Sequence, residues 1–214
     1  MRVHLRTPRA MQRAASAIAA ATVAFAILGT SALAAPPIVR DHLASSAAGA
    51  SNTVCVGTVC TVTSVFAVLN SPDGPTEACL DITRYEQMGT NFALLGYETG
   101  CAPLAEGSFS IEAKGLSGAA LSPTDITVQA FTCDATGCSP MGTRTARVSA
   151  TYTGIGDVFT FRSNSKSTFG GCAMYFVGKG SSREATADLI VDGRSLDALG
   201  SLSTSTQKIK VLCH

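Results

Sequence analysis

The chain has 214 residues with 16 basic and 15 acidic side chains, and only 14% of its residues are charged. Four of the arginines lie in the first 13 residues, so the rest carries 12 basic against 15 acidic residues, a net charge of about −3. That remainder has no run of Lys or Arg, which argues against nucleic acid as a partner, because binding phosphates needs clustered cations.

Residues 1–34 have the pattern of a Sec-type signal peptide. A basic stretch without acidic residues is followed by an uncharged apolar stretch, 14–28, and Ala32 and Ala34 fit the rule for cleavage after Ala34. An uncleaved membrane anchor is the alternative, but residues 29–31 interrupt a stretch already short for a span. We therefore expect a secreted or cell-envelope protein with no stable membrane insertion after cleavage.

Eight cysteines follow the signal peptide and indicate four disulfides, because paired thiols are oxidised in an exported chain. A four-thiolate zinc site built from two C-x4-C pairs is one alternative, and redox-active or free thiols are another. The spacing is wide for zinc, and the redox motif C-x-x-C does not occur. Spacing favours the pairs Cys133–Cys138, Cys55–Cys60, Cys79–Cys101 and Cys172–Cys213.

Short runs rich in β-branched or alternating apolar residues fill the chain beyond residue 57, with turn-forming residues between them. They are 58–69, 78–85, 91–98, 107–113, 125–133, 144–152, 157–163, 172–178, 184–191 and 207–213. This pattern predicts an all-β fold, an antiparallel β-sandwich or open barrel of about ten short strands stapled by disulfides. Residues 35–51 are interpreted as a flexible leader and residues 52–214 as a single β-domain.

The hairpin closed by Cys133 and Cys138 raises a problem of register. If these two residues pair directly and the ladder is regular, Ile126 and Val128 face threonines, whereas the apolar set of the second strand is the even-numbered one from Ala146 to Tyr152. A shift of one residue would bring both apolar sets to the same side. We therefore predict a β-bulge within residues 139–142, where Pro140 and Gly142 lie.

Catalytic equipment is sparse. His4 leaves with the signal peptide, His42 lies in the expected leader and His214 is the last residue, so no supported imidazole is available for a Ser-His-Asp triad. The serine motifs at 115–119 and 163–166 lack their companion elements, and we place the second in a polar loop. We expect no catalytic, cofactor-binding or metal-binding residues, and no cofactor.

Carboxylates leave one enzymatic alternative open, because a glycosidase needs only two of them at a defined separation. The sequence favours no pair among Glu77, Asp81, Glu86, Glu98, Glu106 and Glu112. Without Trp, a platform for a sugar ring would have to come from Tyr85, Tyr97, Tyr152 or Tyr175.

Calcium is the ion that the acidic residues would suit best. However, the spacing of Asp188, Asp192 and Asp197, or of Asp134, does not match an EF-hand loop. We interpret residues 191–194 as a hairpin turn.

Three stretches, TCDATGC, RVSATYTGIGD and SSREATADLIVDG, resemble small uncharacterised secreted bacterial β-rich proteins. The resemblance covers about the last 90 residues. It implies a β-rich fold and export, and no function.

We therefore expect an exported, non-enzymatic β-domain that binds an extracellular ligand, a surface or another protein. Asp134 and Thr136 form the candidate binding loop, because a disulfide-braced loop is preorganised for association. The alternatives are a secreted carboxylate hydrolase acting on glycans and a secreted protease inhibitor that presents this loop.

Overall fold

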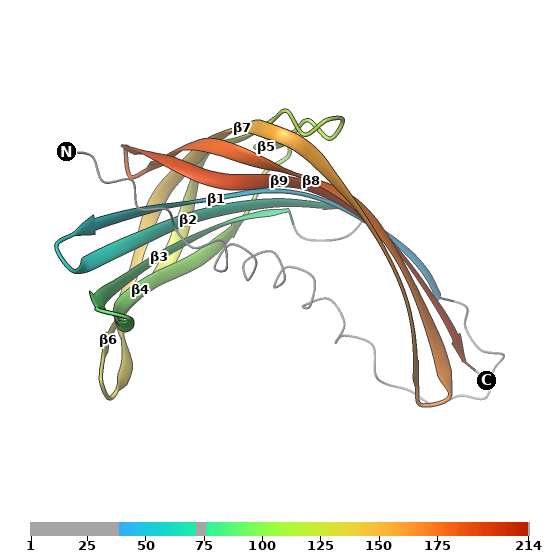
Figure 1. Cartoon of the computed structure of the whole chain (residues 1–214), viewed down its shortest axis with the longest axis horizontal. Helices are drawn as coiled ribbons and strands as arrows, with labels where there is room; N and C mark the ends of the chain where they lie inside the picture. The colour runs from blue at the N-terminus through green and yellow to red at the C-terminus, as the bar shows by residue number, and fades with distance from the viewer. Residues whose placement is uncertain (1–38, 72–75, 214) are drawn as a thin grey trace. The chain divides into compact units, whose positions relative to one another are not determined.

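The computed structural model describes residues 39–71 and 76–213, which form antiparallel β-strands and no helix (Figure 1). The strands are β1 (Val39–Val56), β2 (Val59–Ser71), β3 (Glu77–Met88), β4 (Asn91–Pro103), β5 (Phe109–Ile111), β6 (Gly118–Asp134), β7 (Gly137–Phe169), β8 (Cys172–Val191) and β9 (Arg194–Cys213). Most are longer than predicted. β7 runs through two expected strands and through residues 163–166, where a loop was predicted, and β8 joins the expected strands 172–178 and 184–191. The expected signal peptide lies outside the described residues.

The sheet closes into a ring. Its strand order is β4-β3-β2-β1-β9-β8-β7-β6, and β4 returns to pair with β6 between residues 96–99 and 129–132. The short β5 pairs with β6 beside this closure. Apart from β5, strands that follow one another along the chain pair antiparallel in the ring, so the turns of the hairpins β1–β2, β3–β4, β6–β7 and β8–β9 all lie at the same end. The all-β, antiparallel prediction is confirmed.

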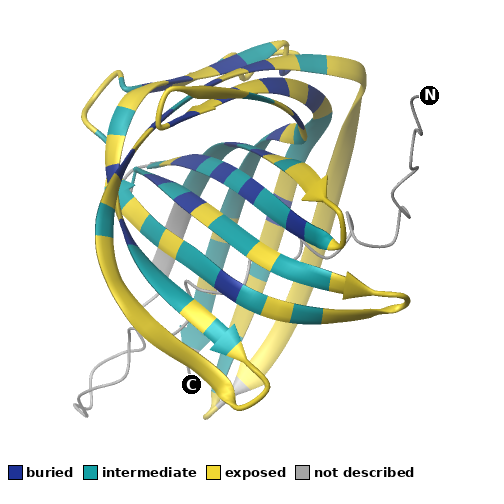
Figure 2. Cartoon of the chain, turned by 90° about the vertical axis from the view of Figure 1, so that its left-hand side faces the viewer, coloured by how far each residue is buried: buried dark blue, intermediate teal, exposed yellow. Residues whose placement is uncertain are grey.

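The core lies inside the ring. Buried and exposed residues alternate along the strands (Figure 2), as expected for a sheet with one face in the core and one in water. Ile126 and Val128 of β6 and Val148 of β7 are fully buried, and the β4–β6 connection adds Leu116 and the nearly buried Phe109. Alanines supply many of the other inward positions, from Ala48 to Ala198.

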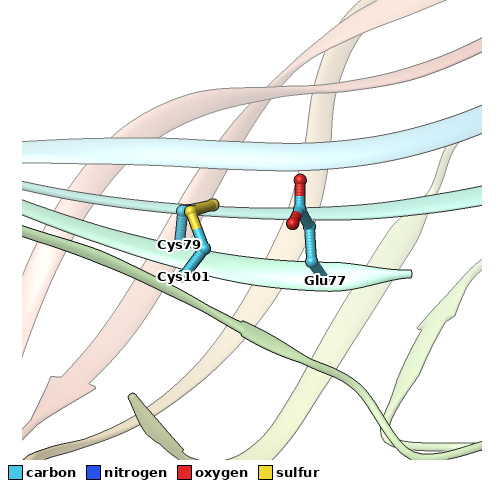
Figure 3. Close-up of side chains that lie close together, drawn as sticks. All are labelled: Glu77, Cys79 and Cys101. Atoms are coloured by element: carbon cyan, nitrogen blue, oxygen red, sulfur yellow. A yellow bond between two sulfur atoms is a disulfide. The ribbon is translucent and has the colours of Figure 1, made fainter. Parts of the chain in front are cut away.

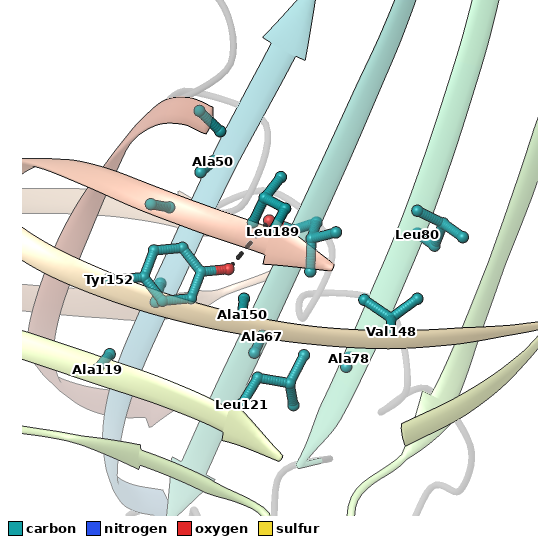
Figure 4. Close-up of a cluster of buried hydrophobic side chains, with 14 of the residues drawn as sticks. Ala50, Ala67, Ala78, Leu80, Ala119, Leu121, Val148, Ala150, Tyr152 and Leu189 are labelled. Atoms are coloured by element: carbon teal, nitrogen blue, oxygen red, sulfur yellow. Dashed lines mark hydrogen bonds between the residues drawn. The ribbon is translucent and has the colours of Figure 1, made fainter. Parts of the chain in front are cut away.

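Tyr152 is the large polar side chain within this core (Figure 4). Its hydroxyl donates a hydrogen bond to the backbone oxygen of Val65 across the ring, at 3.4 Å. Burial raises the pKa of this phenol well above its ordinary value of 10. Tyr152 is therefore a neutral core residue, and it is not available as a platform for a sugar.

The prediction of a flexible leader at 35–51 is wrong for residues 39–51, which belong to β1. Residues 44–51 are all Ala, Ser or Gly, and this lets that part of β1 fit closely between β2 and β9. Gly49 and Gly200 show how tight the approach is, because a Cβ on Gly200 would lie 1.9 Å from the carbonyl oxygen of Gly49. A low-complexity sequence thus forms a central strand through close backbone pairing.

The structure contains the predicted disulfides Cys55–Cys60, Cys79–Cys101 and Cys133–Cys138. The backbone register also places Cys172 opposite Cys213, and Cys172 is held in a disulfide. The side chain of Cys213 lies outside the described part of the molecule.

The predicted bulge in the β6–β7 hairpin is confirmed. Phe131 pairs with Pro140 but Ala130 pairs with Gly142, so Met141 is the extra residue. The shift places Ile126 opposite Ala146, with both side chains in the core. Gly142 adopts a φ of 127°, which side-chain-bearing residues rarely reach.

Candidate anion-binding face

Residues of β7, β8 and β9 continue the sheet past the ring, and the start of β1 pairs along β9 there. β6 pairs with β7 only as far as Thr153, whereas residues 159–169 of β7 go on pairing with residues 172–182 of β8. Residues 203–213 of β9 follow β8 over the same length. Figure 1 shows these strands running side by side, next to the start of β1, toward the C-terminus. We call these three segments the extension.

The register places five cations on one face of the extension. Residues that pair directly share a face of an antiparallel sheet, and so do residues two apart on one strand. Arg162 pairs with Lys179, and Tyr175, four positions from Lys179 on β8, pairs with a lysine on each side. We call the resulting set the basic face: Arg162, Lys166, Lys179, Lys208 and Lys210.

All five side chains of the basic face are exposed. The sequence has no Asp or Glu in 160–182 or in 203–213, so no carboxylate of these segments neutralises them. Lys166 lies with its Nζ 5.4 Å from the ring centroid of Tyr175, which is a cation–π arrangement on the same face. Cations gathered in this way create a local positive potential on a domain whose expected net charge is negative.

An open groove borders Arg162 and Lys179 at the end of the extension nearest the ring. Hydroxyl-bearing residues line much of it, namely Thr160, Ser181, Thr204, Ser205 and Thr206. Guanidinium, ammonium and hydroxyl groups can all donate hydrogen bonds to phosphate, sulfate or carboxylate oxygens. The chemistry of this face is therefore suited to an anion.

Sequence reasoning did not find the basic face, because its members lie far apart along the chain. The signal that could have found it is Gly170-Gly171, a two-residue hairpin turn in which both glycines have positive φ. Counting outward from that turn pairs Arg162 with Lys179. Lys208 and Lys210 join them through the second hairpin, which turns at Asp192-Gly193.

In the candidate binding loop, the side chains of Asp134 and Thr136 are held by hydrogen bonds within the turn. The Asp134 carboxylate accepts hydrogen bonds from the backbone N–H and the hydroxyl of Thr136, at 2.7 and 2.6 Å. The hydroxyl bond, followed by the backbone bond, lowers the pKa of Asp134. The two side chains are exposed but bond to each other, which stabilises the β6–β7 turn. A binding role for them stays a prediction.

Four of the six candidate hydrolase carboxylates are engaged by other side chains. Glu98 pairs with Arg144, and three others accept hydrogen bonds from nearby hydroxyls: Asp81 from Thr99, Glu86 from Thr58 and Glu112 from Ser117. None of the six lines the groove beside Arg162, nor a second groove over β7, β8 and β9. In that second groove Asp188 and Asp197 pair across β8 and β9.

Glu77 lies beside Cys79 and Cys101, and their potential ligand atoms fall within 4.8 Å of one another (Figure 3). The two sulfur atoms are joined in a disulfide. A disulfide sulfur lacks the charge that makes a thiolate a metal ligand. This cluster is therefore not a metal centre.

An ion-pair network lies at the hairpin-turn end of the ring, far along the strands from the basic face. Arg144 contacts Glu98 at 2.6 Å and Asp192 at 2.7 Å, while Asp192 also accepts a hydrogen bond from the backbone N–H of Arg147. Burial acts to raise the pKa of Asp192, but these hydrogen bonds outweigh it and the pKa is lowered. Asp192, which was considered for calcium, is thus engaged by arginine. The predicted turn at 191–194 is present.

Comparison with protein-family models, with curated proteins and with solved structures gives no match to this chain. Within residues 39–71 and 76–213, no helix has the length and apolar character needed to cross a membrane. The disulfides fit an extracytoplasmic protein, because that compartment oxidises paired thiols.

Proposed function

We propose that this protein is an exported, non-enzymatic binding domain whose basic face binds a polyanion. The observation that carries the proposal is the gathering of five exposed cations on one face of the extension, with no acidic residue in the segments that hold them. Surface cations are ordinarily interspersed with carboxylates. A single-sign face of this kind attracts partners of opposite charge.

The strand pairing gives a second reason to assign a function to these cations. Arg162 and Lys179 are direct cross-strand neighbours, and like charges in that position destabilise a sheet. Thr or Ser at either position would fit an exposed strand without repulsion. The arrangement costs stability, which is typical of residues retained for binding.

A column of immobilised heparin, a sulfated polysaccharide, provides a direct test. We expect the oxidised protein to be retained and to elute at a salt concentration that falls when Lys208 and Lys210 are both changed to Ser, because fewer counterions are displaced on binding. The matched control is Arg84→Ser with Lys114→Ser, which removes two exposed cations outside the basic face. Equal elution of the two double variants would contradict the proposal.

A further inference from the structure

The end of the extension carries exposed apolar side chains among its cations. Residues 173–177 of β8 are uniformly apolar in the sequence Ala-Met-Tyr-Phe-Val, next to the β7–β8 turn. Met174, Tyr175 and Val177 are 42%, 37% and 45% exposed. We call residues 173–177 the apolar tip.

The apolar tip presents these side chains on both faces of the sheet. Tyr175 and Val177 share the basic face, since they pair with Lys210 and Lys208. Met174 and Phe176 lie on the opposite face, where they pair with Val211 and Ile209. An ordinary half-buried strand would have one polar face here. A strand that is apolar on both sides and exposed at its end is instead suited to an apolar environment.

Further apolar side chains continue along the face opposite the basic face. Phe159 and Phe161 of β7 are 66% and 43% exposed and share the face of Met174. The ring of Phe161 occupies the space over Gly180 of the neighbouring strand, because a Cβ there would lie 2.5 Å from the ring. The extension therefore carries its cations on one face and exposed apolar side chains on both.

One partner accounts for both features. A soluble polyanion would engage the cations and leave the apolar tip in water. The interface of an anionic bilayer offers phosphates for Lys and Arg and, a few ångströms deeper, an apolar layer for Phe, Met and Val, while Tyr is favoured at the boundary itself. Lysine stems are long enough to keep their ammonium groups at the phosphates while the strand between them is immersed.

We propose that the extension docks on a membrane surface that contains anionic phospholipids, with the apolar tip inserted at the interface and the basic face bound to lipid phosphates. This inference rests on the polyanion binding proposed above and names the partner. Lys166 and Lys210 pair with Tyr175 from either side, so two ammonium groups flank the side chain placed at the boundary. Docking of this kind is peripheral, because the extension binds at the bilayer surface and does not cross it.

A single introduced tryptophan can report on membrane contact by its fluorescence, because the chain contains no Trp. In Met174→Trp the new indole is the only one, and its emission should shift to shorter wavelength when vesicles with about one-third phosphatidylglycerol are added. Vesicles of phosphatidylcholine alone should give no shift. The matched control is Phe92→Trp, at an exposed position on the hairpin-turn end of the ring, which should not respond to either vesicle.

Sedimentation with the same vesicles separates the two proposals. Each cation at an anionic surface contributes about fivefold to affinity, so Lys208→Ser with Lys210→Ser should lose about 25-fold. Met174→Ser with Val177→Ser should lose about tenfold for vesicles and keep its elution from heparin, because only apolar burial is removed. Unfolding midpoints equal to those of the parent protein establish that both variants fold.

Retention on heparin without binding to phosphatidylglycerol vesicles would overturn the membrane inference and leave polyanion binding intact. The same holds if Met174→Ser with Val177→Ser binds vesicles as the parent does. If Lys208→Ser with Lys210→Ser binds heparin and vesicles as the parent does, both proposals are overturned.

Discussion

Arg162 of β7 lies directly opposite Lys179 of β8, and both side chains are exposed. Two cations thus face each other across one strand pair, β7 and β8. We expect Arg162→Thr to leave the free energy of unfolding unchanged or to raise it by up to about 0.5 kcal/mol, because a repulsion is removed. Chemical denaturation with the disulfides intact measures this.

The same substitution should weaken binding to heparin and reduce the salt dependence of that binding by about one counterion. Arg147→Thr serves as the control, since Arg147 is an exposed cation of the same strand that pairs with Asp125 outside the basic face. A clear loss of stability in Arg162→Thr, or equal binding of the two variants, would show that Arg162 is a structural residue.

The free energy of unfolding should depend on the backbone conformation of the bulge at Met141 and Gly142, and hardly at all on the Met141 side chain. Gly142→Ala places a Cβ at a φ of 127°, and we expect a loss of about 1–3 kcal/mol. Met141 is 70% exposed, so Met141→Ser should change stability by less than about 0.5 kcal/mol. Urea denaturation of the two variants checks this, and a tolerated Gly142→Ala would mean that the bulge does not require glycine.

Gly200 should be the least replaceable residue of β9. A Cβ on it would meet the carbonyl oxygen of Gly49 at 1.9 Å and the Cα of Ala50 at 2.6 Å, both on the backbone of β1. We expect Gly200→Ala to cost about 2–3 kcal/mol through separation of the two strands. The neighbouring, exposed Ser201→Ala is the control and should be close to neutral. Thermal unfolding of both proteins provides the comparison.

The Asp192 carboxylate should make the free energy of unfolding depend modestly on pH in the acidic range. Its pKa in the folded protein lies below the ordinary value of 3.8, so the stabilisation is fully present above that value and is lost as the pH falls through the folded pKa. The side chain is 43% exposed, and solvent screening limits the effect to about 0.5 kcal/mol. Asp192→Asn keeps a residue that tolerates the local φ of 52° and removes only the charge.

At pH 7 we expect Asp192→Asn to be less stable than the parent by that amount, and we expect the difference to shrink only as the pH falls below 3.8 and through the folded pKa. Asp125→Asn, in a longer and more exposed ion pair at 3.3 Å, should show almost no difference at either pH. Denaturation curves at the two pH values measure this difference. A difference that persists in acid would mean that the substitution acts through the turn and not through the charge.

Local patterns in the sequence were sufficient for the β3–β4 and β6–β7 hairpins. The spacing of Cys133 and Cys138 and the parity of the apolar residues around Ile126 and Ala146 predicted both the disulfide and the bulge, because a short hairpin fixes its own register. Cys79–Cys101 followed from the midpoint of its hairpin in the same way. These features depend on residues within about twenty positions of one another.

The sequence by itself determined that apolar and polar residues alternate along the strands and that Cys133 and Cys138 pair across a hairpin. Only the tertiary structure decided that residues 39–51 belong to β1, since its small residues at 44–51 carry no periodic signal and are held in place by pairing with β2 and β9. It also decided where the positive charge gathers. Arg162 and Lys210 are separated by two hairpin turns along the chain, and only the combined registers of β7, β8 and β9 place them on one face.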